Sequence, residues 1–296
     1  MTHVKTEKID AITFSEKIKC YAQILKFKIT VFVVISAVFG YFIGVTEYHL
    51  PDVFWLMLGG FLVTGSANAF NQIIERNYDK LMERTKVRPL PQNKLNVIEV
   101  TVVAFLSGII GITVLWVFLN QLSGVLGLLA IFMYAAVYTP LKRISPYAVF
   151  IGAFPGAIPP MLGWVAATGA FSFEAGMLFA IQFFWQFPHF WAIAWRLHPE
   201  YQKAGFKMLP YDKKNRTSAI IIFISSILLL TSSFLPEYYN VTGRVATIGL
   251  FIFSALMVYP SFKLMKTLDD KYALRIMLMS YLYLILSLLV ILIDKA

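Results

Sequence analysis

Nine long apolar stretches dominate this sequence, and they decide which folds the chain can adopt. They cover about residues 29–46, 53–73, 98–118, 122–139, 146–168, 172–195, 217–235, 245–262 and 276–293. A helix needs about 20 mostly apolar residues to cross a bilayer, and each stretch comes close to that length. The sequence therefore predicts an all-α, polytopic membrane protein with nine transmembrane helices.

The composition excludes several other classes of protein. The hydrophobic set makes up 58% of the 296 residues and charged residues only 14%, whereas an ordinary soluble domain has about 25% charged residues. A soluble globule, a disordered chain, a disulfide scaffold and a basic soluble nucleic-acid-binding domain are all excluded. The single cysteine, Cys20, permits neither an intrachain disulfide nor a thiolate metal cluster.

The basic residues predict an orientation in the membrane. With nine spans, every Lys and Arg except Arg244 and Lys295 falls on one side, and basic loops remain cytoplasmic. The N-terminus is therefore predicted inside and the C-terminus outside, and the net charge of +10 indicates topology, not a nucleic-acid partner. Because a polar leader precedes the first stretch, that stretch is no cleaved signal peptide. We expect a cytoplasmic leader at 1–25 and one transmembrane domain at 26–296.

A polar face begins at the end of the second stretch and continues into 74–97, which is one of the two longest predicted inner loops, with 196–216. Asn71, Glu75 and Asp79 are spaced by four residues, so on a helix they share one face. Mg²⁺ prefers one or two carboxylates together with substrate phosphates. Arg84 and Arg88 follow closely, and Arg bridges phosphate oxygens in a bidentate way. The pattern favours a metal–polyphosphate site; the alternative is a solvated helix end with ordinary charge pairs.

Other cations are predicted on the same side of the membrane. Lys142 and Arg143 end the fourth span, and Lys203 and Lys207 lie in the loop after the sixth. They could add positive charge to a phosphate site. The alternative for Lys142 and Arg143 is that they only obey the preference for basic residues in cytoplasmic loops.

Two spans contain unusual residues. Glycines and prolines interrupt the fifth span over 152–164, which indicates a helix that bends around a cavity or a kinked structural helix. In the sixth span, His189 lies well inside the apolar stretch beside Trp185 and Gln186, and such intramembrane residues are functional candidates. His189 suits a haem axial ligand, a proton carrier, or a histidine hydrogen-bonded to a neighbouring helix.

Taken together, these motifs resemble the UbiA-type intramembrane prenyltransferases over about residues 20–290. The family's first signature, an Asn and two acids at spacings of four, is matched by Asn71, Glu75 and Asp79, with Glu where Asp is common. The runs at 82–90, 138–143, 152–164 and 185–190 are similar to the haem-modifying branch. The segment 26–28 departs from the Lys-Pro-Arg often found there, and we attach little weight to this difference. The second acid pair of the members that use aromatic substrates is absent from the loop after span six, which favours the haem branch.

The resemblance implies an enzyme with its helices around a central cavity in a bacterial-type cell (inner) membrane and its active site facing the cytoplasm. It would transfer a farnesyl group from farnesyl diphosphate to a vinyl group of haem b, with addition of water, giving haem O and diphosphate for terminal oxidase assembly. Mg²⁺ would be the cofactor, held by Asn71, Glu75 and Asp79, while haem b is a substrate. Arg84 and Arg88 would complete the catalytic set.

The resemblance also implies a wider substrate-binding set and several partners. The substrate-binding residues would be Asn68, Lys142, Arg143, Trp185, Gln186, His189, Lys203 and Lys207. Membrane lipid surrounds such a protein, and a downstream haem A synthase or terminal oxidase would receive the product. Two alternatives stay open: prenylation of a quinone-type aromatic acid, and a secondary transporter, whose interrupted spans and buried histidine would look similar.

Overall fold

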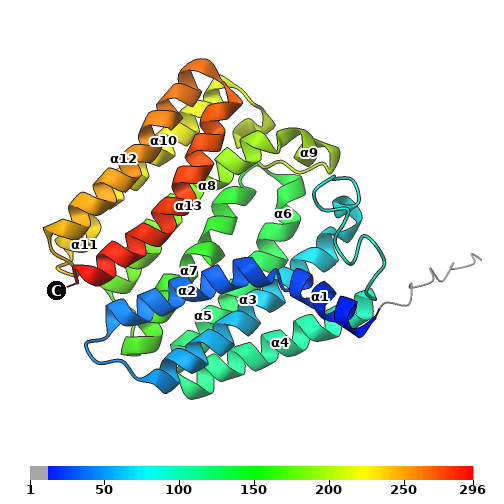
Figure 1. Cartoon of the computed structure of the whole chain (residues 1–296), viewed down its shortest axis with the longest axis horizontal. Coiled ribbons are helices and arrows are strands. Elements are labelled where there is room, and N and C mark those ends of the chain that lie inside the picture. Colours follow the sequence, from blue (N-terminus) through cyan, green and yellow to red (C-terminus); the bar gives the residue numbers. More distant parts are fainter. Residues whose placement is uncertain (1–12, 296) are drawn as a thin grey trace, which may run out of the picture.

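A computed structural model describes residues 13–295, and nearly all regular structure in that range is helical (Figure 1). The predicted leader at 1–25 is therefore seen only from residue 13 onward; Lys5 and Lys8, on which the predicted orientation partly relies, lie outside the described residues. The long helices are α2 (Phe27–Gly44), α3 (Leu50–Asp79), α4 (Val97–Phe118), α5 (Gln121–Ile131), α7 (Ala148–Thr168), α8 (Phe173–Arg196), α10 (Arg216–Ser232), α12 (Arg244–Thr267) and α13 (Asp270–Ile293).

Shorter elements join or extend these helices. They are α1 (Phe14–Ile24), the π-helix η1 (Phe132–Tyr138), α6 (Thr139–Ile144), α9 (His198–Lys203), the 3₁₀ turn η2 (Pro210–Asp212) and α11 (Leu235–Tyr238). An isolated antiparallel bridge joins Thr242 to Lys295. The prediction of an all-α protein is confirmed.

Eight helical segments within residues 13–295 are long and apolar enough to cross a membrane. They are α2, α3, α4, α5 through α6, α7, α10 through α11, α12 and α13. The predicted sixth span corresponds to α8, which is not among them. Its 24 residues extend about 36 Å, which is long enough, but Gln182, Gln186 and His189 make it more polar. The count of nine spans and the orientation of the termini therefore stay predictions.

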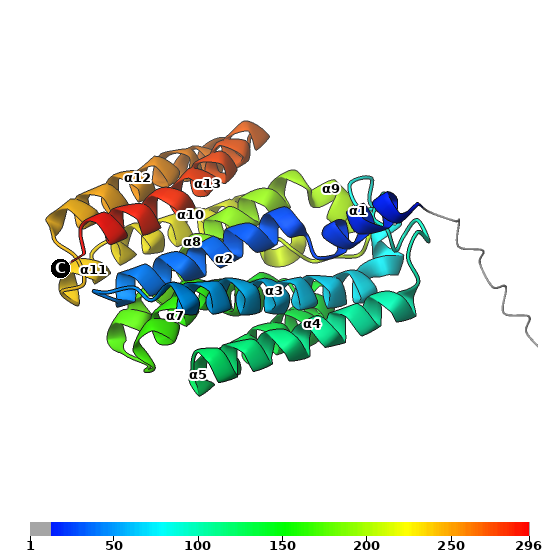
Figure 2. The same cartoon turned by 60° about the horizontal axis from the view of Figure 1, so that its bottom comes forward.

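The helices form two groups that meet along α7 and α8 (Figures 1 and 2). One hydrophobic core is formed mainly by α2, α3, α5 and α7, and a second mainly by α8, α10, α12 and α13. Contacts between α13 and α2 join the groups a second time. The bundle is therefore closed, because the first long helix, α2, contacts the last one, α13.

Helices α2 and α7 approach each other closely because both carry glycine at the crossing. A Cβ atom at Gly40 would lie 2.0 Å from the carbonyl oxygen of Pro160, and one at Gly163 would lie 1.8 Å from that of Ala37. Small residues allow this backbone approach in membrane helices. α7 also continues as one helix through Pro155, Pro159 and Pro160, so the predicted interruption of this span does not break the helix.

The predicted leader is partly docked on the bundle. Thr13 and Glu16 form a reciprocal capping box at the start of α1, an arrangement that satisfies two free backbone N–H groups. At the other end of α1, the side-chain amide of Gln72 on α3 donates to the carbonyl oxygens of Gln23 and Ile24, at 3.0 and 2.8 Å. α1 therefore contacts α3 just beside the predicted polar face.

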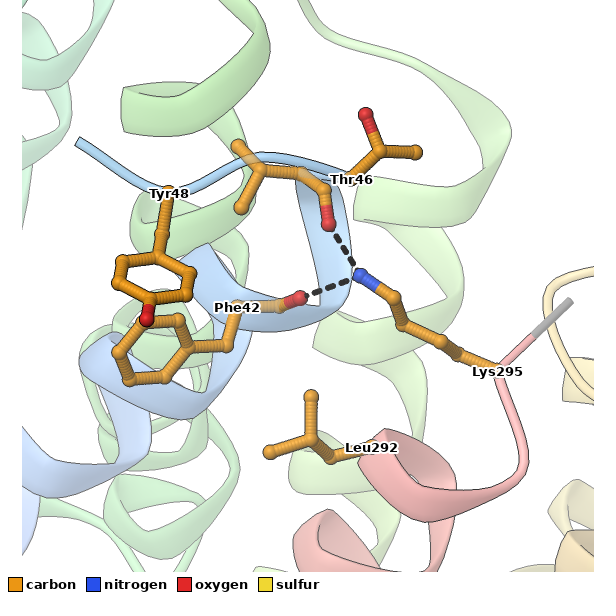
Figure 3. Close-up of a pocket in the computed structure, with 6 residues that line it drawn as sticks. Phe42, Thr46, Tyr48, Leu292 and Lys295 are labelled. Atoms are coloured by element: carbon orange, nitrogen blue, oxygen red, sulfur yellow. Dashed lines mark hydrogen bonds between the residues drawn. The ribbon is translucent and has the colours of Figure 1, made fainter.

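The last described residues hold the end of α2 (Figure 3). The Lys295 ammonium donates to the carbonyl oxygen of Phe42 at 2.8 Å and to that of Val45. A helix leaves its last carbonyls without intrahelical partners, and a cation there is favourable. Lys295 also lines an open pocket of about 440 Å³ together with Tyr48 and Leu292. The C-terminal segment thus stabilises the last turn of α2.

Candidate active site

Helix α3 carries the predicted polar face into the protein interior. It ends at Asp79, beyond the predicted limit of 73, so Asn71, Glu75 and Asp79 all lie on its final turns. These three residues are 1%, 5% and 0% exposed, respectively. Buried carboxylates require charged or hydrogen-bonding partners. The alternative of a solvated helix end is therefore excluded.

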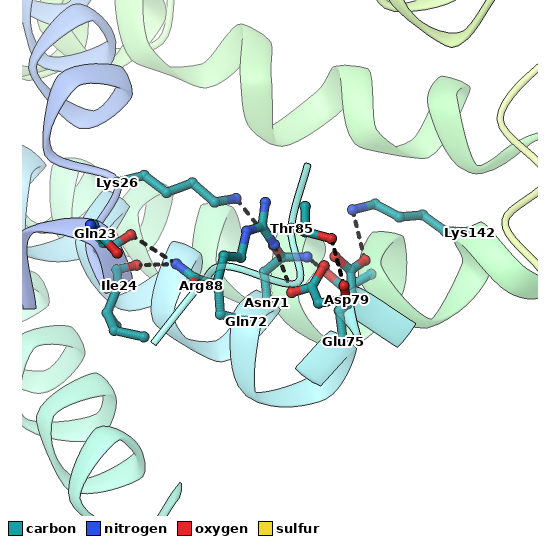
Figure 4. A network of polar contacts seen from close by, with 11 residues as sticks. Gln23, Ile24, Lys26, Asn71, Gln72, Glu75, Asp79, Thr85, Arg88 and Lys142 are labelled. Atoms are coloured by element: carbon teal, nitrogen blue, oxygen red, sulfur yellow. Dashed lines mark hydrogen bonds and ion pairs between the residues drawn. The ribbon is translucent and has the colours of Figure 1, made fainter. Parts of the chain in front are cut away.

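Each carboxylate of this face is paired with a cation from another segment (Figure 4). The Lys142 ammonium, on α6, lies 2.8 Å from Glu75, and the Arg88 guanidinium, in the loop after α3, lies 2.7 Å from Asp79. Removing one partner of a buried pair costs about 3–5 kcal/mol, because it leaves an uncompensated charge. Two of the predicted cations are thus directly beside the acids.

Asn71 joins this face to two further segments. Its Nδ2 donates to the Thr139 hydroxyl at 3.1 Å, and its Oδ1 accepts from the Lys26 ammonium at 3.1 Å. Lys26 caps α2 in the left-handed conformation, with φ of 46°. Burial, together with Arg88 and Lys142, lowers the pKa of Lys26 to about 7. Lys26 is not among the site residues predicted from the sequence, yet it is part of the polar network.

The π-helical segment η1 precedes the residues that reach α3. Thr139 donates to the Tyr134 carbonyl at 2.8 Å, and the Lys142 ammonium lies 4.5 Å from the centroid of the Tyr138 ring, within the range of a cation–π interaction. Single turns of π-helix often occur at functional sites. The sequence predicted one uniform span at 122–139, and this segment was not foreseen.

The Asp79 carboxylate retains an oxygen that could bind a cation. Oδ2 accepts from Arg88, but Oδ1 is buried and has no hydrogen-bond partner among residues 13–295. Buried polar atoms are rarely left without a partner. No group of three His, Cys, Asp or Glu side chains that could hold a metal occurs in the same range. The two acids and the Asn71 amide therefore fit Mg²⁺ only as part of a set that phosphate oxygens complete, which is the arrangement this ion prefers.

Two loops, 80–96 and 197–215, converge over this end of the bundle; we call them the paired loops. The Glu83 N–H donates to the Glu200 carboxylate at 2.6 Å, and the Lys207 N–H donates to the Lys142 carbonyl at 2.7 Å. The rings of Tyr78 and Phe206 lie 6.0 Å apart. Although the loops come from distant parts of the sequence, both contact α3, the helix that carries the acids.

Other predicted binding residues lie around this network without touching the acids. Arg84 is exposed on the first of the paired loops. The Arg143 guanidinium lies 4.1 Å from the centroid of the Tyr78 ring. The exposed Lys203 is paired with Glu200 at 2.9 Å, and the Lys207 ammonium donates to the Ile144 carbonyl at 3.4 Å. Asn68 donates to the Thr30 hydroxyl at 3.2 Å.

The predicted aromatic and histidine cluster lies on α8, facing α13. His189 is 7% exposed, and its Nδ1 lies 2.7 Å from the Ser280 hydroxyl. The Trp185 ring stacks on the imidazole at 4.7 Å between centroids and 16° between planes. Trp185 also donates to the Ser280 carbonyl at 2.7 Å. The predicted hydrogen bond to a neighbouring helix is present, and it occupies only one of the two ring nitrogens.

Gln186 lies in a contact between α8 and α7. Its amide donates to the Ala153 carbonyl at 2.9 Å, and a Cβ atom at Gly156 would lie 2.1 Å from its Oε1. The space beside Gly156 is therefore filled by this amide. The structure brings Gln186 to a helix–helix junction, whereas it brings Asn71, Glu75, Asp79 and the paired cations together in one network.

Comparison with known proteins agrees with this architecture. The profile of the UbiA prenyltransferase family matches residues 33–288. Protoheme IX farnesyltransferase of Christiangramia forsetii is 44% identical over 280 residues, covering 93% of each chain. Protoheme IX farnesyltransferase of Cytophaga hutchinsonii is 42% identical over 287 residues, covering 95% of this chain and 99% of that one.

Solved structures with low sequence identity share the fold. A digeranylgeranylglyceryl phosphate synthase superposes with a TM-score of 0.80 at 19% identity, covering 94% of this chain and 98% of that one. A UbiA homologue of Archaeoglobus fulgidus bound to DMAPP and Mg²⁺ gives 0.65 at 15% identity, covering 92% and 98%. The resemblance seen in the sequence motifs is thus confirmed: the chain is a multi-pass membrane protein that belongs to the UbiA prenyltransferase family.

Proposed function

We propose that this chain transfers a farnesyl group from farnesyl diphosphate to a vinyl group of haem b, giving haem O and diphosphate. The names of its relatives support this reaction. The observation that carries it is the buried network at the end of α3, where two carboxylates are each paired with a cation. When a polyanion binds with its own metal ion, the cations of these pairs can bind the polyanion and the carboxylates can bind the metal. No charge is then left unpaired.

The cations of the network would bind the diphosphate. Arg88 and Lys142 would turn from Asp79 and Glu75 to phosphate oxygens, and Lys26, which the bound polyanion would keep protonated, would supply a third positive charge from the start of α2. Arg84 would approach from the exposed side of its loop. Mg²⁺, held by Asn71, Glu75 and Asp79, supplies charge neutralisation of the leaving group when bound. Positive charge positioned where negative charge develops accelerates departure of the anion.

The transfer breaks one carbon–oxygen bond of farnesyl diphosphate and forms one carbon–carbon bond to haem b. The bond between farnesyl C1 and oxygen breaks, and its electron pair leaves with the diphosphate. The vinyl π electrons of haem b form the new carbon–carbon bond, and water then adds to the resulting cation and loses a proton. Apolar and aromatic walls would keep other water away from the allylic cation. His189, with Trp185 beside it, would orient haem b through its iron.

The protein would lie in the inner membrane of a bacterial-type cell, with its active site facing the cytoplasm. All Lys and Arg residues except two fall on the predicted inner side, in keeping with the preference for basic cytoplasmic loops. α1 and the end of α13 lie at opposite ends of the bundle (Figures 1 and 2), as an odd number of crossings requires. Haem O would pass to a haem A synthase or a terminal oxidase.

Mass spectrometry of extracted haem tests the reaction. Membranes that contain the protein, supplied with haem b, farnesyl diphosphate and Mg²⁺, should yield a haem heavier by one farnesyl group plus water. Membranes without the protein should yield haem b alone. Unmodified haem in both samples, with intact folded protein, would contradict the proposal; a prenylated aromatic acid in its place would identify the other prenyltransferase activity.

A further inference from the structure

The His189 imidazole is held by one hydrogen bond and by contacts with aromatic rings, and the hydrogen bond decides which ring nitrogen carries the proton. The Ser280 hydroxyl on α13 lies 2.7 Å from Nδ1 of His189 and 2.6 Å from the Met277 carbonyl oxygen. A carbonyl can only accept, so the single hydroxyl proton is used toward Met277. A hydroxyl oxygen also has two acceptor lone pairs. Ser280 therefore accepts a hydrogen bond from Nδ1–H of His189.

This assignment leaves a lone pair on the other nitrogen. A neutral imidazole with its proton on Nδ1 presents Nε2 as an acceptor or metal ligand. No hydrogen-bond partner of Nε2 lies within residues 13–295, and Nε2 is not among the fully enclosed polar atoms of that range that lack a partner. The nitrogen is therefore free to bind a ligand that enters from the partly open side of the ring.

The orientation of the ring is fixed as firmly as its tautomer. Trp185 stacks on one face, and the ring of Tyr281 contacts the imidazole at 5.1 Å with 74° between planes. Trp185 is itself held by its bond to the Ser280 carbonyl. Both the hydroxyl and the carbonyl of Ser280 thus position this cluster. Ser280 is fully buried.

We infer that Ser280 is a positioning residue that prepares Nε2 of His189 to ligate the iron of a metalloporphyrin. The inference rests on the proposed function and deepens it. A hydrogen bond to the second nitrogen of a metal-bound histidine fixes the tautomer and raises the basicity of the ligand. Loss of such partners typically costs about 10- to 100-fold in metal affinity or activity.

Spectroscopy of the purified protein with haem b tests the inference. The variant Ser280→Ala should bind haem b about 10- to 100-fold more weakly, and the iron–histidine stretching frequency of its ferrous complex should fall. Ser280→Cys keeps nearly the same volume, but its sulfur accepts hydrogen bonds only weakly. Its haem affinity and iron–histidine frequency should therefore lie between those of the wild type and Ser280→Ala. This variant also tests the inference if Ser280→Ala does not fold. Ser287→Ala is the matched control, since Ser287 is also buried on α13 but donates to Leu284.

The outcomes separate this inference from the proposed function. If His189→Ala loses the histidine–iron band while both Ser280 variants keep the wild-type frequency and affinity, Ser280 has no positioning role and the proposed function stands. If His189→Ala leaves the haem spectrum unchanged, the axial role of His189 and the inference about Ser280 both fall. If wild-type protein makes no haem O yet shows the expected shifts, the inference holds and the proposed reaction is wrong.

Discussion

Helices α3 and α8 each bury a row of polar side chains toward the end covered by the paired loops, but the two rows differ in charge. The rows are Asn71, Glu75 and Asp79 on α3, and Gln182, Gln186 and His189 on α8. On α3 the two carboxylates are paired with cations from α6 and from the loop after α3, and Asn71 accepts a hydrogen bond from Lys26. On α8 the Gln186 amide donates to a backbone carbonyl and His189 bonds to a serine hydroxyl.

The difference indicates what each row can bind. A network of paired charges can accept a polyanion with its metal, since every ion finds a new partner. A neutral imidazole held among aromatic rings suits a large, flat, apolar molecule with a metal at its centre. The two substrates of the proposed reaction would therefore be recognised by different physical means on different helices.

The largest expected effect comes from removing a charge on α3. Asp79→Asn or Glu75→Gln should lower kcat for haem O formation by about 100-fold or more, because the leaving diphosphate loses its organised neutralisation. Asp52→Asn is the matched control: it lies near the opposite end of α3 and bonds to Tyr41 and His49. A carboxylate variant that forms haem O at the wild-type rate would exclude the proposed metal site.

Metal removal should affect the function of the polar row on α3 but not that of the row on α8. Chelation with EDTA should abolish turnover, and added Mg²⁺ should restore it, because phosphate oxygens and the α3 acids need the ion between them. The absorption spectrum of bound haem b should stay the same, since the α8 cluster has no acidic group. A spectral change on chelation would show that the two sites are not independent, and full activity in EDTA would exclude a metal.

A smaller effect is expected at Lys26. Lys26→Ala removes one charged hydrogen-bond donor from the network and should raise KM for farnesyl diphosphate by about tenfold, equivalent to about 1.4 kcal/mol. Lys26→Arg should recover part of this loss because it keeps the charge. Lys28→Ala, an exposed cation two residues away, should leave KM unchanged. Equal effects of both alanine variants would indicate general electrostatic attraction.

The smallest effect is expected at Gln186. Gln186→Leu removes the bond to Ala153 and should lower the free energy of unfolding by about 1 kcal/mol, the usual size for a polar contact between membrane helices. Thermal unfolding in detergent would measure the change. Activity per folded molecule should persist if Gln186 serves only the helix junction. A loss of haem binding without loss of stability would instead support the predicted substrate contact.

Much of the fold could be predicted from the sequence because apolar length is a local property. The predicted apolar spans end too early where polar residues continue a helix beyond the apolar core. α3 extends to Asp79, and α6 carries Lys142 in a helix after the predicted span has ended. In both places the side-chain partners are charged groups from other segments of the chain, and a pattern of apolar residues contains no information about them.

The candidate site was partly predictable for a similar reason. Spacings of four placed Asn71, Glu75 and Asp79 on one face, and the structure buries that face. Lys26 and Ser280 were missed because neither belongs to a spacing pattern: one is a lone lysine at a helix start, the other a serine in an apolar helix. Their importance comes from neighbours that are distant in sequence.

The π-helical segment η1 makes the number of residues in this stretch matter more than their identity. Phe132–Tyr138 carries no charged side chain, so most conservative substitutions there leave the polar network untouched. Deleting a single residue is different, because the i to i−5 hydrogen bonds of this segment, such as that from the Thr139 N–H to the Tyr134 carbonyl, would lose their register. Thr139 would swing away from Asn71 and Lys142 away from Glu75 in one step. The number of residues in η1 therefore determines whether the side chains of α6 point at α3.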